Sequence, residues 1–155
     1  MKILIVILAI TLNLFALNAQ GERVQYNTSE KNSFTDIPDE VKSSIDKFFT
    51  EMVNGNIKKA YEGILKDSPI LNNKDDLRNL IEQTTKSIDI YGSLKDYEAV
   101  SVEKASPSYI RFRYLGLHTD FPMRWLFTFY NSPGSGWILT NIKFDDLSEF
   151  FFDEE

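Results

Sequence analysis

The sequence of 155 residues contains no cysteine and only one histidine, His118. Without cysteine there can be no disulfide, no thiolate nucleophile and no cysteine-ligated metal or cluster. A single histidine without converging acidic residues does not favour a metal site. Basic runs are also missing, and 17 Lys and Arg against 23 Asp and Glu give a formal net charge of −6. Binding to nucleic acid is therefore not expected.

Recognised catalytic and nucleotide-binding motifs are missing as well. The sequence holds no Gly-x-Ser-x-Gly, no P-loop and no dinucleotide fingerprint. The glycine-rich stretch 133–136 reads as a hairpin turn, because no helix follows it to bind a phosphate. We therefore predict no catalytic residue, no metal site and no cofactor.

The N-terminal residues 1–19 have the features of a signal peptide. Lys2 supplies a positive start, an apolar stretch follows, and Ala19 is a small residue at the cleavage position. A retained membrane anchor is the alternative, which Asn13 within the apolar stretch disfavours. We predict a secreted or periplasmic protein, with no stable membrane insertion after cleavage and a flexible leader over residues 20–35. Secretion without cysteine favours a bacterial source.

Residues 36–155 are predicted to form a single domain, which begins with three amphipathic helices. Apolar residues recur at helical spacing in each of three segments, 38–53, 57–65 and 73–91. Asn73 is a predicted N-cap, and Gly55 and Gly92 are predicted to end the first and third helices. Three helices with one apolar face each must cover a sheet.

After Leu94 the apolar period changes from 3.6 to 2, which predicts an antiparallel sheet. The fold class is therefore α+β, with three N-terminal helices packed on a curved sheet of about four strands. An acidic and aromatic tail, residues 145–155, follows the last strand. The predicted strands are Tyr97–Ala105, Ser108–Leu115, Phe121–Tyr130 and Trp137–Phe144.

The alternation assigns the strand residues to two faces. The inner face, toward the helices, is almost wholly apolar. It is predicted to carry Val100, Val102, Ile110, Phe112, Tyr114, Met123, Trp125, Phe127, Phe129, Ile138, Thr140, Ile142 and Phe144.

The outer face is predicted to be too apolar for a sheet that only meets water. Its arginines and aromatic residues are of the types that anchor interfaces, which favours a homodimer across this face. The alternatives are that residues 150–152 fold back over it, or that scattered surface aromatics are tolerated. The arginines could instead receive an anionic ligand or acidic partner, or be neutralised by Glu103 and the tail. The predicted interface residues are Arg111, Arg113, Arg124, Leu126, Tyr130, Trp137 and Leu139.

Three segments resemble the nuclear-transport-factor-2-like (cystatin-like α+β) superfamily. They are Phe48–Met52 (FFTEM), Asn54–Tyr61 (NGNIKKAY) and Gly136–Ile142 (GWILTNI). The likeness covers residues 36–146 and is one of fold rather than of activity. It implies a cone with a pocket at its mouth between the helices and the sheet, and an outer sheet face that often dimerises.

Enzymes of this superfamily are expected to place an Asp, or an Asp–His pair, inside the cone. The predicted inner face has no Asp, Glu or His, the helical phase of Asp89 points it away from the core, and His118 falls in a predicted loop beside Asp120. The other residues predicted inside the cone could line an apolar pocket or be ordinary core. The candidate ligand-binding residues are Tyr61, Tyr91, Tyr114, Met123, Trp125 and Thr140.

These features predict a secreted, non-catalytic binding domain. It would hold a small apolar ligand in the cone or a protein partner on the sheet, with the outer-face arginines as the place for an anionic ligand. Two alternatives stay open: a small isomerase, dehydratase or hydrolase using the pocket, and a structural envelope-assembly protein docking through its tail.

Overall fold

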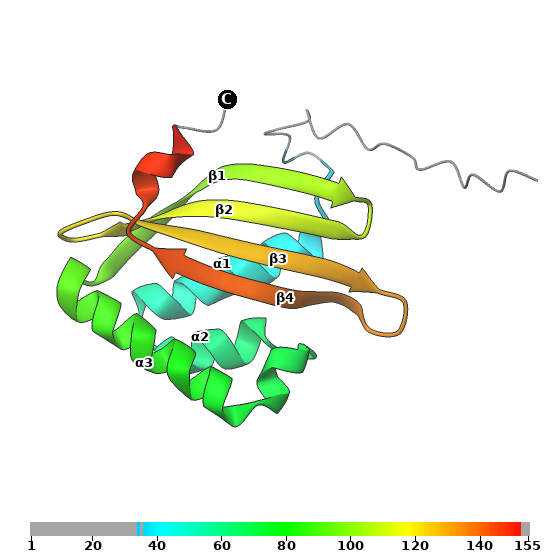
Figure 1. The fold of residues 1–155 in the computed structure, drawn as a ribbon, viewed down its shortest axis with the longest axis horizontal. Helices are drawn as coiled ribbons and strands as arrows, with labels where there is room; N and C mark the ends of the chain where they lie inside the picture. The colour runs from blue at the N-terminus through cyan, green and yellow to red at the C-terminus, as the bar shows by residue number, and fades with distance from the viewer. Residues whose placement is uncertain (1–33, 35, 153–155) are drawn as a thin grey trace, which may run out of the picture.

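The computed structural model describes residue 34 and residues 36–152 (Figure 1). The predicted signal peptide, residues 1–19, and residues 20–33 and 35 of the predicted leader lie outside the described residues. Phe34, the described residue of that leader, is partly buried against the core. Among the described residues, no helix has the length and apolar character needed to cross a membrane.

Three α-helices precede four strands, as predicted for an α+β chain. A short 3₁₀ helix, η1, connects the second and third helices, and another, η2, follows the last strand. The elements are α1 (Asp39–Val53), α2 (Ile57–Ile64), η1 (Pro69–Asn72), α3 (Lys74–Tyr91), β1 (Leu94–Ser106), β2 (Tyr109–His118), β3 (Met123–Ser132), β4 (Gly136–Asp145) and η2 (Ser148–Phe151).

The predicted helix ends are confirmed by local geometry. The Asn73 side chain accepts a hydrogen bond from the Asp75 amide at 3.1 Å, as an N-cap does. Gly55 follows α1 with φ at 77°, and Gly92 follows α3 with φ at 84°, conformations that L side chains rarely adopt. Pro38 is the N-cap of α1 rather than its first helical residue, so this boundary lies one residue later than predicted.

The strands form one open antiparallel sheet in the order β1-β2-β3-β4. The helices gather on one side of it, and α1 passes behind the strands in the view of Figure 1. This side contains the core. The apolar stripe of α1 is 2% exposed or less, and its Phe48 ring lies 5.5 Å from Trp125 and 5.4 Å from Phe127 in edge-to-face contacts.

The predicted inner face is confirmed in the middle of the sheet. The β2–β3 register is unbroken and places Phe112 opposite Phe127 and Tyr114 opposite Trp125, all of them buried. In the β1–β2 pair, however, the register shifts between Ala99 and Ser101. Val100 is therefore an extra residue at a bulge, while the inward position opposite Tyr114 belongs to Ala99.

The predicted faces are wrong at the start of β4, because a second bulge lies there. Phe129 pairs with Leu139 while Thr128 pairs with Asn141, so Thr140 is an extra residue. An extra residue reverses the faces of all residues beyond it. Leu139 thus lies on the inner side and is 0% exposed.

Two residues near Leu139 also lie on the face opposite to the one predicted for them. Trp137 packs against the core on the helix side, although we predicted it on the outer face. Ile138 lies opposite the outer-face residue Tyr130, although we predicted it inside. Trp137 and Leu139 therefore leave the predicted outer-face interface.

Candidate functional site

The predicted centre of the cone is filled by side chains. Four of the candidate ligand residues, Tyr61, Tyr114, Met123 and Trp125, are 6% exposed or less and belong to the core. The Tyr61 hydroxyl is 2.7 Å from the Thr84 hydroxyl. Burial raises the pKa of Tyr61 strongly and that of Tyr114 to about 12. Both phenols are therefore neutral at physiological pH, and these residues contribute packing rather than a titrating group.

The fifth candidate, Tyr91, holds the end of α3 in place. Its hydroxyl donates to Asp146 Oδ2 at 2.7 Å, and this hydrogen bond raises the pKa of Tyr91. Its carbonyl accepts hydrogen bonds from the amides of Asp120 and Phe121. Tyr91 thus joins α3 to the β2–β3 loop and to the segment after β4.

The sixth candidate, Thr140, lies at a cleft between α3 and the edge strand β4. The cleft has a volume of about 360 Å³. Five of its eight lining residues have polar side chains, although most of its surface is apolar. It is lined by Ile70, Asp76, Asn79, Leu80, Gln83, Thr140, Asn141 and Ile142.

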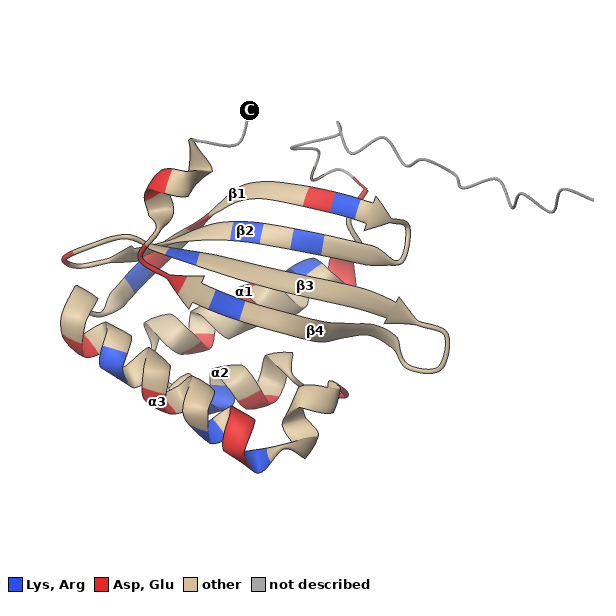
Figure 2. Cartoon of the chain, viewed as in Figure 1, with Lys and Arg blue, Asp and Glu red and all other residues tan. Residues whose placement is uncertain are grey.

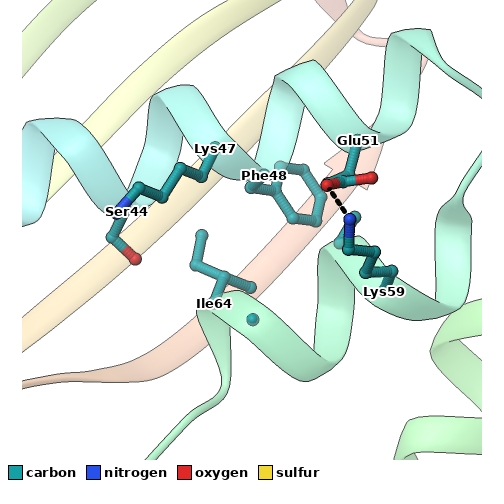
Figure 3. A pocket seen from close by; sticks show the side chains of 8 residues that line it. Ser44, Lys47, Phe48, Glu51, Lys59 and Ile64 are labelled. Carbon is teal, nitrogen blue, oxygen red and sulfur yellow. Dashed lines mark ion pairs between the residues drawn. The ribbon is translucent and has the colours of Figure 1, made fainter.

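A second cavity, more apolar, lies between α1 and α2 and has a volume of about 240 Å³ (Figure 3). Phe48, Ala60 and Ile64 form its apolar surface and are 4% exposed or less. At one end Glu51 and Lys59 form an ion pair at 2.6 Å. We call this the α1–α2 groove, lined by Ser44, Lys47, Phe48 and Glu51 of α1 and by Lys59, Ala60, Gly63 and Ile64 of α2.

The α1–α2 groove continues toward the start of β4. An adjoining hollow of about 310 Å³ shares Ser44, Gly63 and Ile64 with it. This hollow reaches Trp137 and Leu139, the two residues that the β4 bulge turns inward. Its lining also includes Glu40, Val41, Lys66, Asp67 and Phe129.

Gly63 lines both hollows and is not required there by the fold. A Cβ atom at this position would meet no atom within 4 Å, and the backbone φ is not positive. Glycine inside a helix costs about 0.5–1 kcal/mol relative to alanine. The residue therefore lowers helix stability and leaves the α2 backbone open to the groove. A glycine inside a predicted helix is unfavourable, and this property of Gly63 was the local indication of the groove in the sequence.

The outer face neutralises most of its arginine charge. Arg113 is 6% exposed and contacts Glu103 at 2.7 Å, and Arg111 bonds the same carboxylate. Burial works to raise the pKa of Glu103, but the two guanidinium groups outweigh burial, so the pKa is lowered. Arg124 makes two hydrogen bonds to Asp145, at 3.0 and 2.9 Å. Figure 2 shows both basic and acidic positions on the strands of the sheet.

The tail covers part of this outer face. The guanidinium carbon of Arg124 lies 5.7 Å from the centroid of the Phe150 ring, within the range of a cation–π contact. Phe152 is 86% exposed. Five predicted interface residues, Arg111, Arg113, Arg124, Leu126 and Tyr130, therefore share the outer face, but two of these arginines are largely occupied inside the molecule.

His118 ends β2 rather than lying in a loop. Its Nδ1 is 2.8 Å from the Gly92 carbonyl, so this nitrogen carries the hydrogen and donates. Nε2 is buried and has no hydrogen-bond partner among the described residues. Burial lowers the pKa of His118, and the bond to Gly92 offsets this in part. The imidazole is thus neutral and structural.

The described residues offer no proton-transferring group inside the core. Their buried polar and charged residues are Ser68, Thr84, Ser101, Arg113 and Thr128, with no carboxylate among them. Asp89 is exposed on α3. No group of three or more His, Asp or Glu in the described part of the chain is placed to hold a metal ion.

Comparison with protein families, with curated proteins and with solved structures finds no match.

Proposed function

We propose that this protein is a non-catalytic binding domain that holds an apolar ligand in the α1–α2 groove. The observation that carries this proposal is the apolar groove itself, lined on α2 by Gly63, an exposed helix glycine that no neighbour requires. Ligand sites are typically concave and mostly apolar, with a few polar groups that fix orientation. Phe48 and Ile64 supply the apolar surface, and Ser44 and Lys47 supply the polar groups.

The groove is preferred over the α3–β4 cleft because an apolar ligand in the groove would remove water from fewer polar groups. Apolar burial contributes about 25 cal/mol per Å² removed from water. In the α3–β4 cleft, the amides of Asn79 and Gln83 and the Asp76 carboxylate would lose water on binding. The hollow beside Trp137 adds volume to the groove, although most of its own surface is polar. Together the two hollows fall within the volume of about 300–1,000 Å³ that is usual for small-molecule sites.

The same proposal includes the superfamily to which the fold would belong and the location of the protein. The order of three helices followed by an antiparallel four-stranded sheet supports a nuclear-transport-factor-2-like cone. The space between the helices and the sheet is occupied by aromatic side chains, which favours the α1–α2 groove over the centre of such a cone as the ligand site. Export through a signal peptide at residues 1–19 would set the domain in the periplasm or outside the cell. Mass spectrometry of the exported protein tests this, and a mature N-terminus at Met1 would contradict it.

The test of the binding proposal uses a neutral apolar dye, N-phenyl-1-naphthylamine, titrated into the mature chain. We expect saturable fluorescence enhancement that the Gly63→Leu variant abolishes, because leucine is a good helix former and its side chain would fill the groove. The matched control is Gln83→Leu, which adds a leucine to the α3–β4 cleft instead. Loss of dye binding in Gln83→Leu with binding retained in Gly63→Leu would assign the site to that cleft.

A second measurement separates a blocked groove from a damaged fold. Gly63→Ala introduces a methyl group into open space, so it should stabilise the protein by about 0.5–1 kcal/mol. Chemical unfolding measures this change. A destabilised Gly63→Ala variant would mean that the fold itself needs the glycine, and the argument for a ligand would fail.

Homodimerisation through the outer face is a second candidate, supported by one observation. Tyr109 and Tyr130 lie opposite each other on neighbouring strands and are 44% and 37% exposed, beside the half-exposed Arg111. Tyrosine and arginine are the residues that most often anchor interfaces. Sedimentation velocity over a micromolar concentration series tests the dimer, with Tyr130→Asp as the disrupting variant and Thr85→Asp on α3 as its control. A monomer throughout the series would remove this candidate.

The two other functions receive less support from the described residues. An isomerase, dehydratase or hydrolase would need a buried acid or base at the pocket, and the buried polar groups include no carboxylate. Docking of the tail on an envelope partner would use the exposed Phe152. Deletion of residues 145–155 tests it: unchanged folding with loss of a partner favours docking, whereas loss of folding assigns the tail to the core.

A further inference from the structure

We propose that the ligand of the α1–α2 groove is an anionic amphiphile, a single acidic head group on an aliphatic chain. This inference rests on the proposed function and adds the chemical class of the ligand. The acidic group would meet Ser44 and Lys47, and the chain would lie on Phe48, Gly63 and Ile64.

The charges of the groove lining support an anionic head group. Glu51 and Lys59 neutralise each other in their ion pair, which leaves Lys47 as the remaining charge of the lining. Lys47 makes no ion pair among the residues that the structure describes. Hydrogen bonds from Lys59 and from the Asn56 amide also lower the pKa of Glu51, which favours its ionised form. A ligand of opposite charge would compensate Lys47.

The position of the Lys47 side chain places its charge where a head group would sit. Figure 3 shows this side chain lying along α1 toward Ser44, on the groove side of the helix. A carboxylate has two oxygens that accept hydrogen bonds, and the ammonium and hydroxyl groups are both donors. The aliphatic part of Lys47 adds apolar cover to the groove, as lysine stems often do.

The far end of the groove argues against the opposite orientation. Around the hollow beside Trp137, Glu40 and Asp67 outnumber Lys66, so the net charge there is negative. An acidic head group would be repelled at that end, where the partly exposed Trp137 is an apolar residue that a longer chain could reach. The charge difference between the two ends therefore selects an amphiphile that is acidic at one end and apolar at the other.

Gly63 explains how an extended chain would fit between the helices. It lines both hollows, and the space above its Cα is empty. Any side chain here would stand in the path from Ser44 toward Trp137. A glycine at this one position lets a methylene chain touch the helix backbone and pass from one hollow to the other.

The test compares three probes that share one alkyl chain: dodecanoate, dodecanol and dodecylammonium, each titrated below its micelle concentration into the mature chain. Calorimetry or fluorescence gives the affinities. We expect dodecanoate to bind about tenfold more tightly than dodecanol, the value of one charge-assisted hydrogen bond. Lys47→Gln should lower dodecanoate affinity to that of dodecanol and leave dodecanol unchanged. Lys58→Gln is the control, because Lys58 carries the same charge on α2 but does not line the groove.

The outcomes distinguish this inference from the proposed function. Equal binding of dodecanoate and dodecanol, both blocked by Gly63→Leu, would overturn the anionic head group and leave the apolar site standing. Tighter binding of dodecylammonium would assign the head group to an acidic residue and overturn the inference as well. If no alkyl probe binds, both proposals fail. If Lys58→Gln weakens dodecanoate as much as Lys47→Gln does, the attraction is general surface charge and the assignment to Lys47 is wrong.

Discussion

Leu126 and Phe127 are neighbours on β3, yet their side chains enter two regions with different chemistry. Phe127 lies among the rings of Phe48, Phe49 and Trp125 on the inner face, with no charged group buried there. Leu126 lies opposite Arg113 on the outer face. There the buried residues include the polar Ser101, Arg113 and Thr128, which are 9% exposed or less, besides the apolar Ile138.

The middle of the sheet is therefore sequestered from water on both sides, but different forces hold the two sides. The inner face is stabilised by apolar burial and ring contacts, which do not depend on protonation. The outer face depends on carboxylates that neutralise buried or half-buried guanidinium groups. Acid should weaken the outer face and leave the inner face unchanged, which is a difference that mutations can measure.

The largest expected effect comes from the inner face. Phe48→Ala removes a ring that is 2% exposed and contacts four other aromatic rings. We expect the free energy of unfolding to fall by about 4 kcal/mol, and by the same amount at neutral and acidic pH. Urea unfolding at both pH values measures it. Phe152→Ala is the control, since that ring is 86% exposed and its loss should change little. A strong pH dependence of the Phe48→Ala effect would break the comparison.

On the outer face we expect a smaller and pH-dependent effect. Glu103→Gln removes the carboxylate that neutralises Arg113 and should cost about 2 kcal/mol at neutral pH. Because the folded pKa of Glu103 is lowered, its contribution is present above the unfolded value near 4.5 and is lost as the pH falls through the folded pKa. The difference between wild type and Glu103→Gln should therefore vanish in strong acid.

The control for this prediction is Glu98→Gln, the same substitution at an exposed position of the same strand. Surface changes of this kind usually stay within about 0.5 kcal/mol. A Glu103→Gln penalty that persists unchanged in acid would show that the side chain acts through packing rather than through charge.

On the helix side, one buried hydrogen bond tests whether apolar packing alone stabilises the inner region. Tyr61 and Thr84 are 0% and 1% exposed, and their hydroxyl groups join α2 to α3. Tyr61→Phe and Thr84→Val should each cost about 1 kcal/mol, because each leaves one buried hydroxyl without its partner. The double variant should cost no more than either single change, a coupling that a double-mutant cycle measures. Additive losses would mean that the two hydroxyls do not depend on each other.

The sequence predicted the inner face correctly wherever the strands pair without interruption. From Ile110 to Tyr114 and from Met123 to Phe129, alternation alone assigns the face, because β2 and β3 have no register shift. The helix caps Asn73, Gly55 and Gly92 were also predictable, since each depends only on local geometry.

Alternation fails where a bulge adds a residue, since a bulge depends on tertiary packing and leaves no clear mark in the apolar pattern. The extra residue Thr140 donates a hydrogen bond to the Thr128 carbonyl, and Ser68 of the η1 segment donates to the Leu139 carbonyl at 2.6 Å. These contacts join segments that are far apart in the sequence. The bulge turns Trp137 and Leu139 toward the helices. The period-2 alternation of strand residues could not predict this change of face.

The candidate site was missed for a related reason. The resemblance predicted a pocket at the centre of a cone, but Tyr114 and Trp125 are packed in the core. The α1–α2 groove is formed by residues that appear polar or unremarkable in the sequence, such as Ser44 and Lys47. Gly63 was the available local signal, because glycine is unfavourable inside a helix. Its meaning depends on the empty space above it, which only the packing of α1 against α2 defines.

The smallest expected effect concerns His118, where the sheet meets the end of α3 beside the exposed Asp120. Burial lowers its folded pKa below the usual 6.5, so its contribution to stability is complete above 6.5 and declines as the pH falls toward the folded pKa. We expect a loss of less than about 1 kcal/mol between neutral pH and pH of about 5, a range in which Glu103, whose pKa is lowered, stays ionised. His118→Asn provides the test, because its side-chain amide can still donate to the Gly92 carbonyl but does not titrate. Unfolding measurements should show the decline in stability in the wild type and not in this variant. A decline in both proteins would assign the titration to another group. The difference between the two faces would then depend on Glu103 and Asp145 alone.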